Sequence, residues 1–215
     1  MPRYPTVLFD LDGTLIDSIG LIIESFHHTW AHFGLPRRSD AEWLAGVGTP
    51  LRAQFAPVTR DEAEIEAMIA VYREYNIAHH DARVRPYPGV VESVRALRAS
   101  GVRLGIVPSK NRQGTLRGLR AAGLVDAFDL LVCADDVTRH KPHREPVDRA
   151  VAQLGAAAPA TLFVGDSVHD MAAGRAAEVG TGAALWGPFA REHLTPAEPS
   201  HWLEAPAEVG ELALG

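Results

Sequence analysis

The sequence is poor in cysteine and in lysine. Cysteine occurs once, as Cys133, so no disulfide can form within the chain, and its apolar surroundings predict a buried thiol. Of the 21 basic residues, nineteen are arginines and only Lys110 and Lys141 are lysines. We therefore predict that these two positions require a compact ammonium group in place of a planar guanidinium, with chance in an arginine-rich chain as the alternative.

Long hydrophobic runs and an excess of positive charge are also missing. No apolar run approaches the length of a membrane span, and residues 1–5 lead directly into an apolar run without room for a signal peptide. We expect a cytoplasmic protein with no membrane partner. The net charge of −6 argues against a nucleic-acid partner. No pattern in the sequence indicates the oligomeric state.

Two aspartates one residue apart end the first apolar run, which reads VLFDLDGT over residues 7–14. Two like charges this close cost free energy unless a cation lies between them. Gly13 followed by Thr14 suits a turn that directs backbone N–H groups at an anion. The pattern indicates a metal-assisted phosphate site, whereas the simpler alternative is a pair of turn-forming acids at a strand end.

Short apolar runs alternate with helical patterns along most of the chain. This alternation predicts an α/β fold with a doubly wound, parallel sheet. The predicted strands are residues 6–9, 102–107, 130–133, 161–164 and 181–185, and the predicted helices are residues 90–99, 116–122, 146–154 and 205–214, with another opened by a capping-box pattern from Ser167 to Asp170.

Residues 16–85 differ from the rest because they show helical periodicity without a strand signal. Apolar residues recur at helical spacing between Ile19 and Phe33, and the sequence Thr59-Arg60-Asp61-Glu62 predicts a capping box before a second long helix. We predict a catalytic core formed by residues 1–15 and 86–215, and a helical cap domain formed by residues 16–85.

Residues suited to chemistry follow the ends of four predicted strands. In a parallel sheet the carboxyl ends of the strands meet at one edge, where ligands bind. These residues are Asp10 and Asp12 after the first strand, Ser109 and Lys110 after the second, Lys141 after the third, and Asp166 and Asp170 after the fourth. We therefore predict that they share one crevice.

The order and spacing of these motifs resemble the haloacid dehalogenase (HAD) superfamily over nearly the whole chain. Asp-x-Asp-Gly-Thr at residues 10–14 is similar to its nucleophile motif, Gly-Ile-Val-Pro-Ser-Lys at 105–110 to its second motif, Lys141-Pro142 to its third, and residues 165–170 to its acidic fourth motif. The helical insertion resembles the helical cap subclass. The resemblance implies a Rossmann-like HAD core with an inserted cap.

The same resemblance implies a Mg²⁺-dependent phosphatase of small phosphorylated metabolites that works through an aspartyl-phosphate intermediate. Asp10 would be the nucleophile and Asp12 the general acid and then the base. Lys141 would neutralise Asp10 and the transferring phosphoryl group. The expected Mg²⁺ ligands are Asp10, the backbone carbonyl of Asp12, and Asp166, with Asp170 in support.

Phosphate-binding groups are expected in the first turn and in the second motif. The N–H groups of Gly13 and Thr14 and the hydroxyl of Ser109 are the candidates. Family members usually carry threonine or serine where this chain has Pro108, which supplies neither a hydroxyl nor an N–H. We expect Ser109, with its own N–H, to compensate, and weakened phosphate binding is the alternative.

Lys110 and the cap are candidate contacts for the part of the substrate beyond the transferring phosphoryl group. Lys110 is either a second phosphate contact or a structural partner of Asp170, and we favour the partner. The cap turn at residues 46–50 suits an anion or a substrate tail, so Gly48 and Thr49 are candidate substrate contacts, although an ordinary interhelical loop explains the turn equally well. Arg52 just beyond it is a candidate for a second anion, with a solvated side chain as the default.

The chain resembles two kinds of HAD enzyme that differ in the leaving group. It is similar to phosphoglycolate phosphatases, and residues 72–81, together with Lys110, resemble bacterial HAD-type inorganic pyrophosphatases. We predict a phosphoglycolate phosphatase-like activity. The alternatives are an inorganic pyrophosphatase, a phosphosugar mutase and a non-catalytic module that binds a phosphorylated metabolite.

Overall fold

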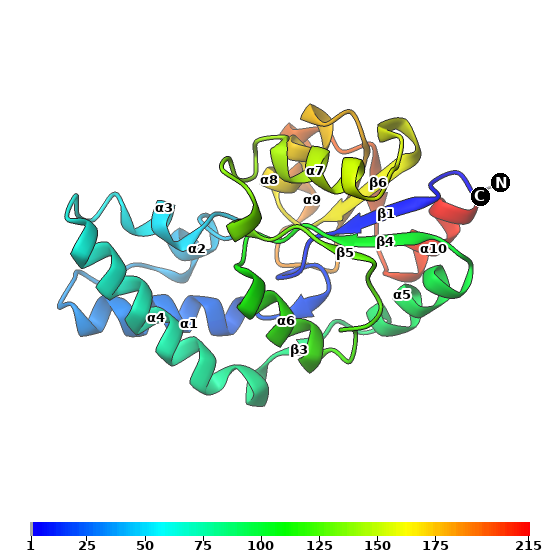
Figure 1. Ribbon diagram of the computed structural model, residues 1–215. Helices are drawn as coiled ribbons and strands as arrows, with labels where there is room; N and C mark the ends of the chain where they lie inside the picture. The colour runs from blue at the N-terminus through cyan, green and yellow to red at the C-terminus, as the bar shows by residue number, and fades with distance from the viewer. Residues whose placement is uncertain (1) are drawn as a thin grey trace.

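Six parallel strands form the sheet that carries the candidate catalytic residues (Figure 1). The computed structural model describes residues 2–215, and in it the strands follow the order β5-β4-β1-β6-β7-β8. This sheet confirms the predicted α/β class. Strand β1 (Thr6–Phe9) lies near the middle of the sheet and is buried along its whole length. The other strands are β4 (Arg103–Ile106), β5 (Leu130–Leu131), β6 (Thr161–Gly165), β7 (Gly180–Ala184) and β8 (His201–Leu203).

Helices cover both faces of the sheet because successive β1 side chains point to opposite faces. Val7 and Phe9 belong to the cluster with α5, α6 and α10, whereas Leu8 packs with α7 and α8. No helix within residues 2–215 is long and apolar enough to cross a membrane. These elements are α5 (Val90–Ala99), α6 (Arg112–Ala121), α7 (Glu145–Gln153), α8 (Val168–Ala176), α9 (Arg191–Leu194) and α10 (Ala207–Leu214), with short 3₁₀ turns η1 (Ala134–Asp136), η2 (Ala158–Ala160) and η3 (Thr195–Ala197).

Four helices occupy the segment between Ile19 and Arg83, beside the carboxyl ends of the strands (Figure 1). They have an aromatic core of their own, in which the rings of Phe26 and Trp43 stack with centroids 4.7 Å apart. This separate core supports the division into core and cap that we propose. The elements are α1 (Ile19–His32), α2 (Asp40–Leu44), α3 (Leu51–Phe55) and α4 (Glu62–Arg83), and the antiparallel strands β2 (Ile16–Asp17) and β3 (Arg85–Pro86) pair where the chain enters and leaves the cap.

The sequence prediction differs from the structure at the ends of elements and in the shortest strands. Four of the five predicted strands agree to within one residue at each end, but in 130–133 only Leu130–Leu131 is strand. Strands β2, β3 and β8 are not predicted by the sequence, because two or three residues are too few to show alternation. Helix α6 begins four residues before its predicted start because the Asn111 side chain accepts a hydrogen bond from Gly114 N and caps it.

The predicted capping box at residues 59–62 is wrong. Helix α4 begins at Glu62, and its N-cap is Asp61, whose carboxylate accepts from Ala63 N at 2.9 Å. Thr59 Oγ1 accepts from Asp61 N and so lies outside the helix. Aspartate caps a helix as well as threonine does, and Asp61 lies two residues closer than Thr59 to Ile65, the first buried residue of α4.

Candidate functional site

Asp10 and Lys141 form the centre of the crevice at the carboxyl edge of the sheet. Asp10 directly follows β1, and its N–H donates to Val164 O of β6 at 2.9 Å. Lys141 Nζ donates to Asp10 Oδ1 at 2.7 Å and to Asp170 Oδ1 at 2.6 Å. The relative exposure of Lys141 is 3% and that of Asp10 is 5%, so one buried ammonium group joins the first motif to the fourth.

Asp10, Asp166 and Asp170 form a buried carboxylate cluster. Each offers one oxygen, and these oxygens lie within 4.8 Å of one another. Asp166 Oδ1 accepts from Thr14 Oγ1 at 2.7 Å, but Asp166 Oδ2 is buried without a hydrogen-bond partner in the part of the chain that the structure describes. Closely spaced carboxylate oxygens with one unpartnered buried oxygen fit a hard divalent cation such as Mg²⁺.

The cluster contains more buried carboxyl groups than buried cationic groups. Burial raises the pKa of Asp10 from 3.8 to about 7, the Lys141 ammonium opposes this rise, and Asp170 adds to it. Burial also raises the pKa of Asp166, with further contributions from Asp170 and Asp10. Burial lowers the pKa of Lys141, but the two carboxylates outweigh it and raise that pKa overall. One ammonium group therefore faces three buried carboxyl groups, which a bound cation would help to neutralise.

The fourth motif fixes Asp170 by a capping box, as predicted. Ser167 N and Ser167 Oγ donate to Asp170 Oδ2 at 3.0 and 2.5 Å, and Asp170 N donates back to Ser167 Oγ. These hydrogen bonds fix the first turn of α8, which begins three residues after the end of β6. This leaves Asp170 Oδ1 for Lys141 and the cluster.

Gly13 and Thr14 support Asp166 and do not present free donors to an anion. Gly13 N donates to Ile16 O and Thr14 N to Leu11 O, because the turn closes on itself. The prediction that these N–H groups point at a phosphate is therefore wrong for this structure. Gly13 has φ +89°, and a Cβ there would lie 2.4 Å from Asp166 Oδ2, so only glycine permits this approach.

Asp12 lies beside the buried cluster and has its own cationic partner. Its Oδ1 accepts from Ser18 Oγ at 2.6 Å and from Lys110 Nζ at 2.7 Å. Lys110 therefore does not pair with Asp170, contrary to the prediction. The reason is that Asp170 is already held by Lys141 and by the capping box, whereas Lys110 precedes α6 on the side of Asp12.

The second motif contacts the cap. Ser109 Oγ donates to Gly48 O at 2.5 Å, so its hydroxyl proton is committed to the cap and does not directly replace the donor that Pro108 lacks. Gly48 has φ +93°, and a Cβ there would lie 3.2 Å from Ser167 Oγ. Thr49 Oγ1 donates to Gly46 O within the loop. The predicted cap loop thus lies directly over the core site, but its hydroxyl is already used.

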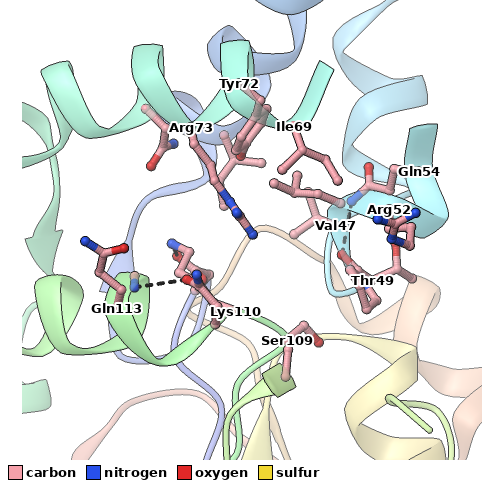
Figure 2. A pocket seen from close by; sticks show the side chains of 18 of the residues that line it. Val47, Thr49, Arg52, Gln54, Ile69, Tyr72, Arg73, Ser109, Lys110 and Gln113 are labelled. Carbon is pink, nitrogen blue, oxygen red and sulfur yellow. Dashed lines mark hydrogen bonds and ion pairs between the residues drawn. The ribbon is translucent and has the colours of Figure 1, made fainter. Parts of the chain in front are cut away.

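A cavity of about 450 Å³ lies between core and cap. Asp10, Asp12, Ser109 and Lys110 line it from the core, and Gly48, Thr49, Arg52, Arg73 and His80 are among its cap residues. Figure 2 shows the Arg73 side chain extending from α4 into this space above Lys110. Arg52 forms ion pairs with Glu62 and Glu66 instead.

Arg73 and His80 line the cavity and lie in the segment 72–81 that resembles HAD-type pyrophosphatases, but the sequence analysis selected neither as a site residue. Their spacing of seven residues on α4 places both on one helix face, and the sequence contains this signal. It indicates a site only when that face is known to meet the core. His80 has 2% relative exposure, and its Nε2 has no hydrogen-bond partner within residues 2–215. Its Nδ1 lies 3.0 Å from Asp81 Oδ1.

Comparison with known proteins places these features in context. The family model described as "Haloacid dehalogenase-like hydrolase" matches residues 7–184. The chain is 42% identical over 204 residues to "Pyrophosphatase PpaX" of Anoxybacillus flavithermus, covering 95% of this chain and 94% of that protein.

Two solved structures have the same fold. A hydrolase of the haloacid dehalogenase-like family from Streptococcus pneumoniae superposes with a TM-score of 0.82 at 24% identity, covering 96% of this chain and 97% of that one. A predicted phosphoglycolate phosphatase from Haemophilus somnus gives a TM-score of 0.87 at 22% identity and covers 99% of both chains. At these identities the two structures establish the architecture alone.

Proposed function

The chain belongs to the haloacid dehalogenase-like hydrolase family, and from this premise we propose that it is a Mg²⁺-dependent phosphatase of small phosphorylated metabolites. The observation that carries the proposal is the buried ammonium of Lys141 held between Asp10 and Asp170, next to the unpartnered oxygen of Asp166. This arrangement combines a nucleophile, a fixed positive charge and a set of oxygen ligands. We expect the enzyme to act in the cytoplasm.

Asp10 is the nucleophile in the proposed reaction. One of its carboxylate oxygens attacks phosphorus, the bond to the leaving-group oxygen breaks, and Asp12 donates a proton to that oxygen. Water then attacks the aspartyl phosphate while Asp12 takes up a proton, which releases phosphate and restores Asp10. Lys141 fixes the orientation of Asp10 and offsets its charge during both steps.

Asp10, Asp166 and Asp170, with the backbone carbonyl of Asp12, are the groups that would hold Mg²⁺. The bound ion supplies positive charge that reduces the repulsion between a carboxylate and a phosphoryl group. Thr14 and Ser167 keep two of these carboxylates in place by hydrogen bonds. Their contribution is to fix the ligand oxygens before substrate binds.

Inorganic pyrophosphate is the substrate that we propose to test first. The sequence alone favoured a phosphoglycolate phosphatase-like activity, but a relative at 42% identity is named a pyrophosphatase. Arg73 and Lys110 are among the four cationic side chains that line the same cavity as Asp10, which suits a substrate with a second anionic group. 2-Phosphoglycolate also has such a group and is the second candidate.

The test is phosphate release from pyrophosphate, 2-phosphoglycolate, sugar phosphates and nucleotides, with Mg²⁺ or with EDTA. Asp10→Asn is the matched control, since it preserves the size of the side chain and removes the nucleophile. We expect Mg²⁺-dependent release that this variant abolishes. Transfer of phosphate between positions of a sugar without release would instead identify a mutase, and binding without turnover would identify a non-catalytic module.

A further inference from the structure

Helix α4 presents one stripe of side chains to the cavity. Ile69, Tyr72, Arg73, Asn76 and His80 recur at spacings of one, three or four residues and all line the same space. The first two are buried in the aromatic core of the cap. The polar part of the stripe begins at Arg73, and in Figure 2 this side chain leaves α4 on the side that faces the core.

Arg73 differs from the other cavity cations in having no carboxylate partner. Arg52 pairs with Glu62 and Glu66, Lys110 pairs with Asp12, and Arg117 pairs with Asp81. Among the arginines and lysines that line the cavity, only Arg73 forms no ion pair with the described residues 2–215. Its guanidinium donors are therefore free for an anionic ligand.

The position of Arg73 relative to the reacting groups suits a substrate with two anionic ends. Asp10 and Asp12 line the core side of the cavity, and Arg73 lines the cap side. A phosphoryl group at Asp10 would leave the other end of a short substrate facing the cap. Guanidinium binds the oxygens of a phosphate through two parallel N–H donors, which fixes orientation as well as charge.

We propose that Arg73 is a specificity-determining residue that binds the leaving phosphoryl group of a diphosphate while the other phosphoryl group lies at Asp10. This inference rests on the proposed phosphatase function. Lys110 carries a second positive charge beside Asp12, so the leaving group lies between two cations. A phosphomonoester without a second anionic group makes no use of Arg73.

The experiment compares Arg73→Met and Arg73→Lys with the wild type on two substrates. Pyrophosphate has the second phosphoryl group, and p-nitrophenyl phosphate has none. Arg60→Met is the control. Arg60 is an exposed cap arginine outside the cavity, and its substitution removes the same charge. Melting temperatures of all variants, measured with Mg²⁺, establish that the cap remains folded.

We expect Arg73→Met to lower kcat/KM for pyrophosphate by roughly 10- to 100-fold, the size of a lost charge-assisted phosphate contact, with KM rising. The value for p-nitrophenyl phosphate and the activity of Arg60→Met should stay unchanged. Arg73→Lys should recover part of the loss, because it keeps the charge without the planar fork.

The outcomes separate this inference from the function on which it rests. A wild type that releases no phosphate from either substrate overturns both. An active wild type overturns the inference alone if Arg73→Met reduces both activities equally or reduces neither. 2-Phosphoglycolate is run as a third substrate. If Arg73→Met lowers kcat/KM for 2-phosphoglycolate alone, Arg73 does not bind the leaving phosphoryl group of a diphosphate.

Discussion

Lys141 Nζ and Asp10 Oδ1 lie 2.7 Å apart in a part of the crevice that is almost closed to solvent. The same nitrogen lies 2.6 Å from Asp170 Oδ1, so one charge serves two carboxylates from different motifs. Arginine could not take this place without displacing them, because its guanidinium is larger and planar. The presence of lysine at this position, in a chain with only two lysines, therefore has a structural reason.

Lys141→Met should weaken both the fold and the reaction. Removing one partner of a buried ion pair leaves the other charge without compensation, which costs roughly 3–5 kcal/mol of unfolding free energy. Loss of the fixed positive charge should also reduce phosphate release by roughly 100-fold or more. Thermal and denaturant unfolding check the first effect. An unchanged melting temperature in EDTA would contradict the role assigned to this ammonium.

The stabilising effect of Mg²⁺ should increase with pH. Burial raises the pKa of Asp10 to about 7 in the folded protein, above its ordinary value of 3.8, and the pKa of Asp166 rises in the same direction. A raised pKa means that the protonated carboxyl stabilises the fold. That contribution is complete below about pH 4 and is lost as the pH rises through about 7.

Calorimetry with Mg²⁺ or EDTA at pH 5 and pH 8 measures this linkage. In EDTA the melting temperature should be lower at pH 8 than at pH 5. Mg²⁺ should raise the melting temperature more at pH 8 than at pH 5. Asp10→Asn removes one of the titrating groups and should flatten the pH dependence in EDTA. Equal Mg²⁺ shifts at both pH values in the wild type would count against the proposed ligand set.

Gly13→Ala should disturb the proposed Mg²⁺ site beyond its cost in backbone strain. The residue has φ +89°, and an added Cβ would lie 2.4 Å from Asp166 Oδ2, so the carboxylate must move. Gly123→Ala is the matched control, because its φ is +67° but an added Cβ meets no atom within 4 Å. The control should lose about 1 kcal/mol through strain alone.

Mg²⁺ titration of the melting temperature distinguishes the two glycine variants. Gly13→Ala should require higher Mg²⁺ for the same stabilisation and should lose activity, whereas Gly123→Ala should keep wild-type Mg²⁺ dependence. If both variants respond to Mg²⁺ alike, Gly13 acts only through its backbone conformation.

Much of the site was predictable because its position follows from topology. If the apolar run before Asp10 is assigned to a central parallel strand, the residues that follow the neighbouring strands must lie at the same carboxyl edge of the sheet. The capping box at Ser167 was predictable for a different reason: it depends on contacts within four residues. The first inference uses the alternation of strands and helices along the chain, and the second uses four consecutive residues.

Two local predictions failed, the capping box at residues 59–62 and the anion-facing N–H groups of Gly13 and Thr14. The other failures depend on contacts between distant segments. The choice of Lys110 between Asp12 and Asp170 depends on which carboxylates are already occupied. The Thr14 hydroxyl turns to Asp166, which is far away in sequence. Arg73 resembles any exposed helix arginine until the cavity between cap and core is known. In each case one residue type suits several partners, and only packing selects among them.

Pro108→Thr should strengthen phosphate binding. Pro108 supplies no N–H or hydroxyl, and the neighbouring Ser109 hydroxyl donates to Gly48 O, so neither Pro108 nor that hydroxyl donates to a phosphate in this structure. Threonine would add both groups, and a hydrogen bond to a charged oxygen is worth about 1.5–3 kcal/mol, which corresponds to roughly 10-fold or more in affinity. Product inhibition by phosphate measures this directly. Pro108→Ala separates the two donors, because it adds only the N–H. If neither variant lowers the inhibition constant, the loop at Pro108 does not contact the phosphoryl group.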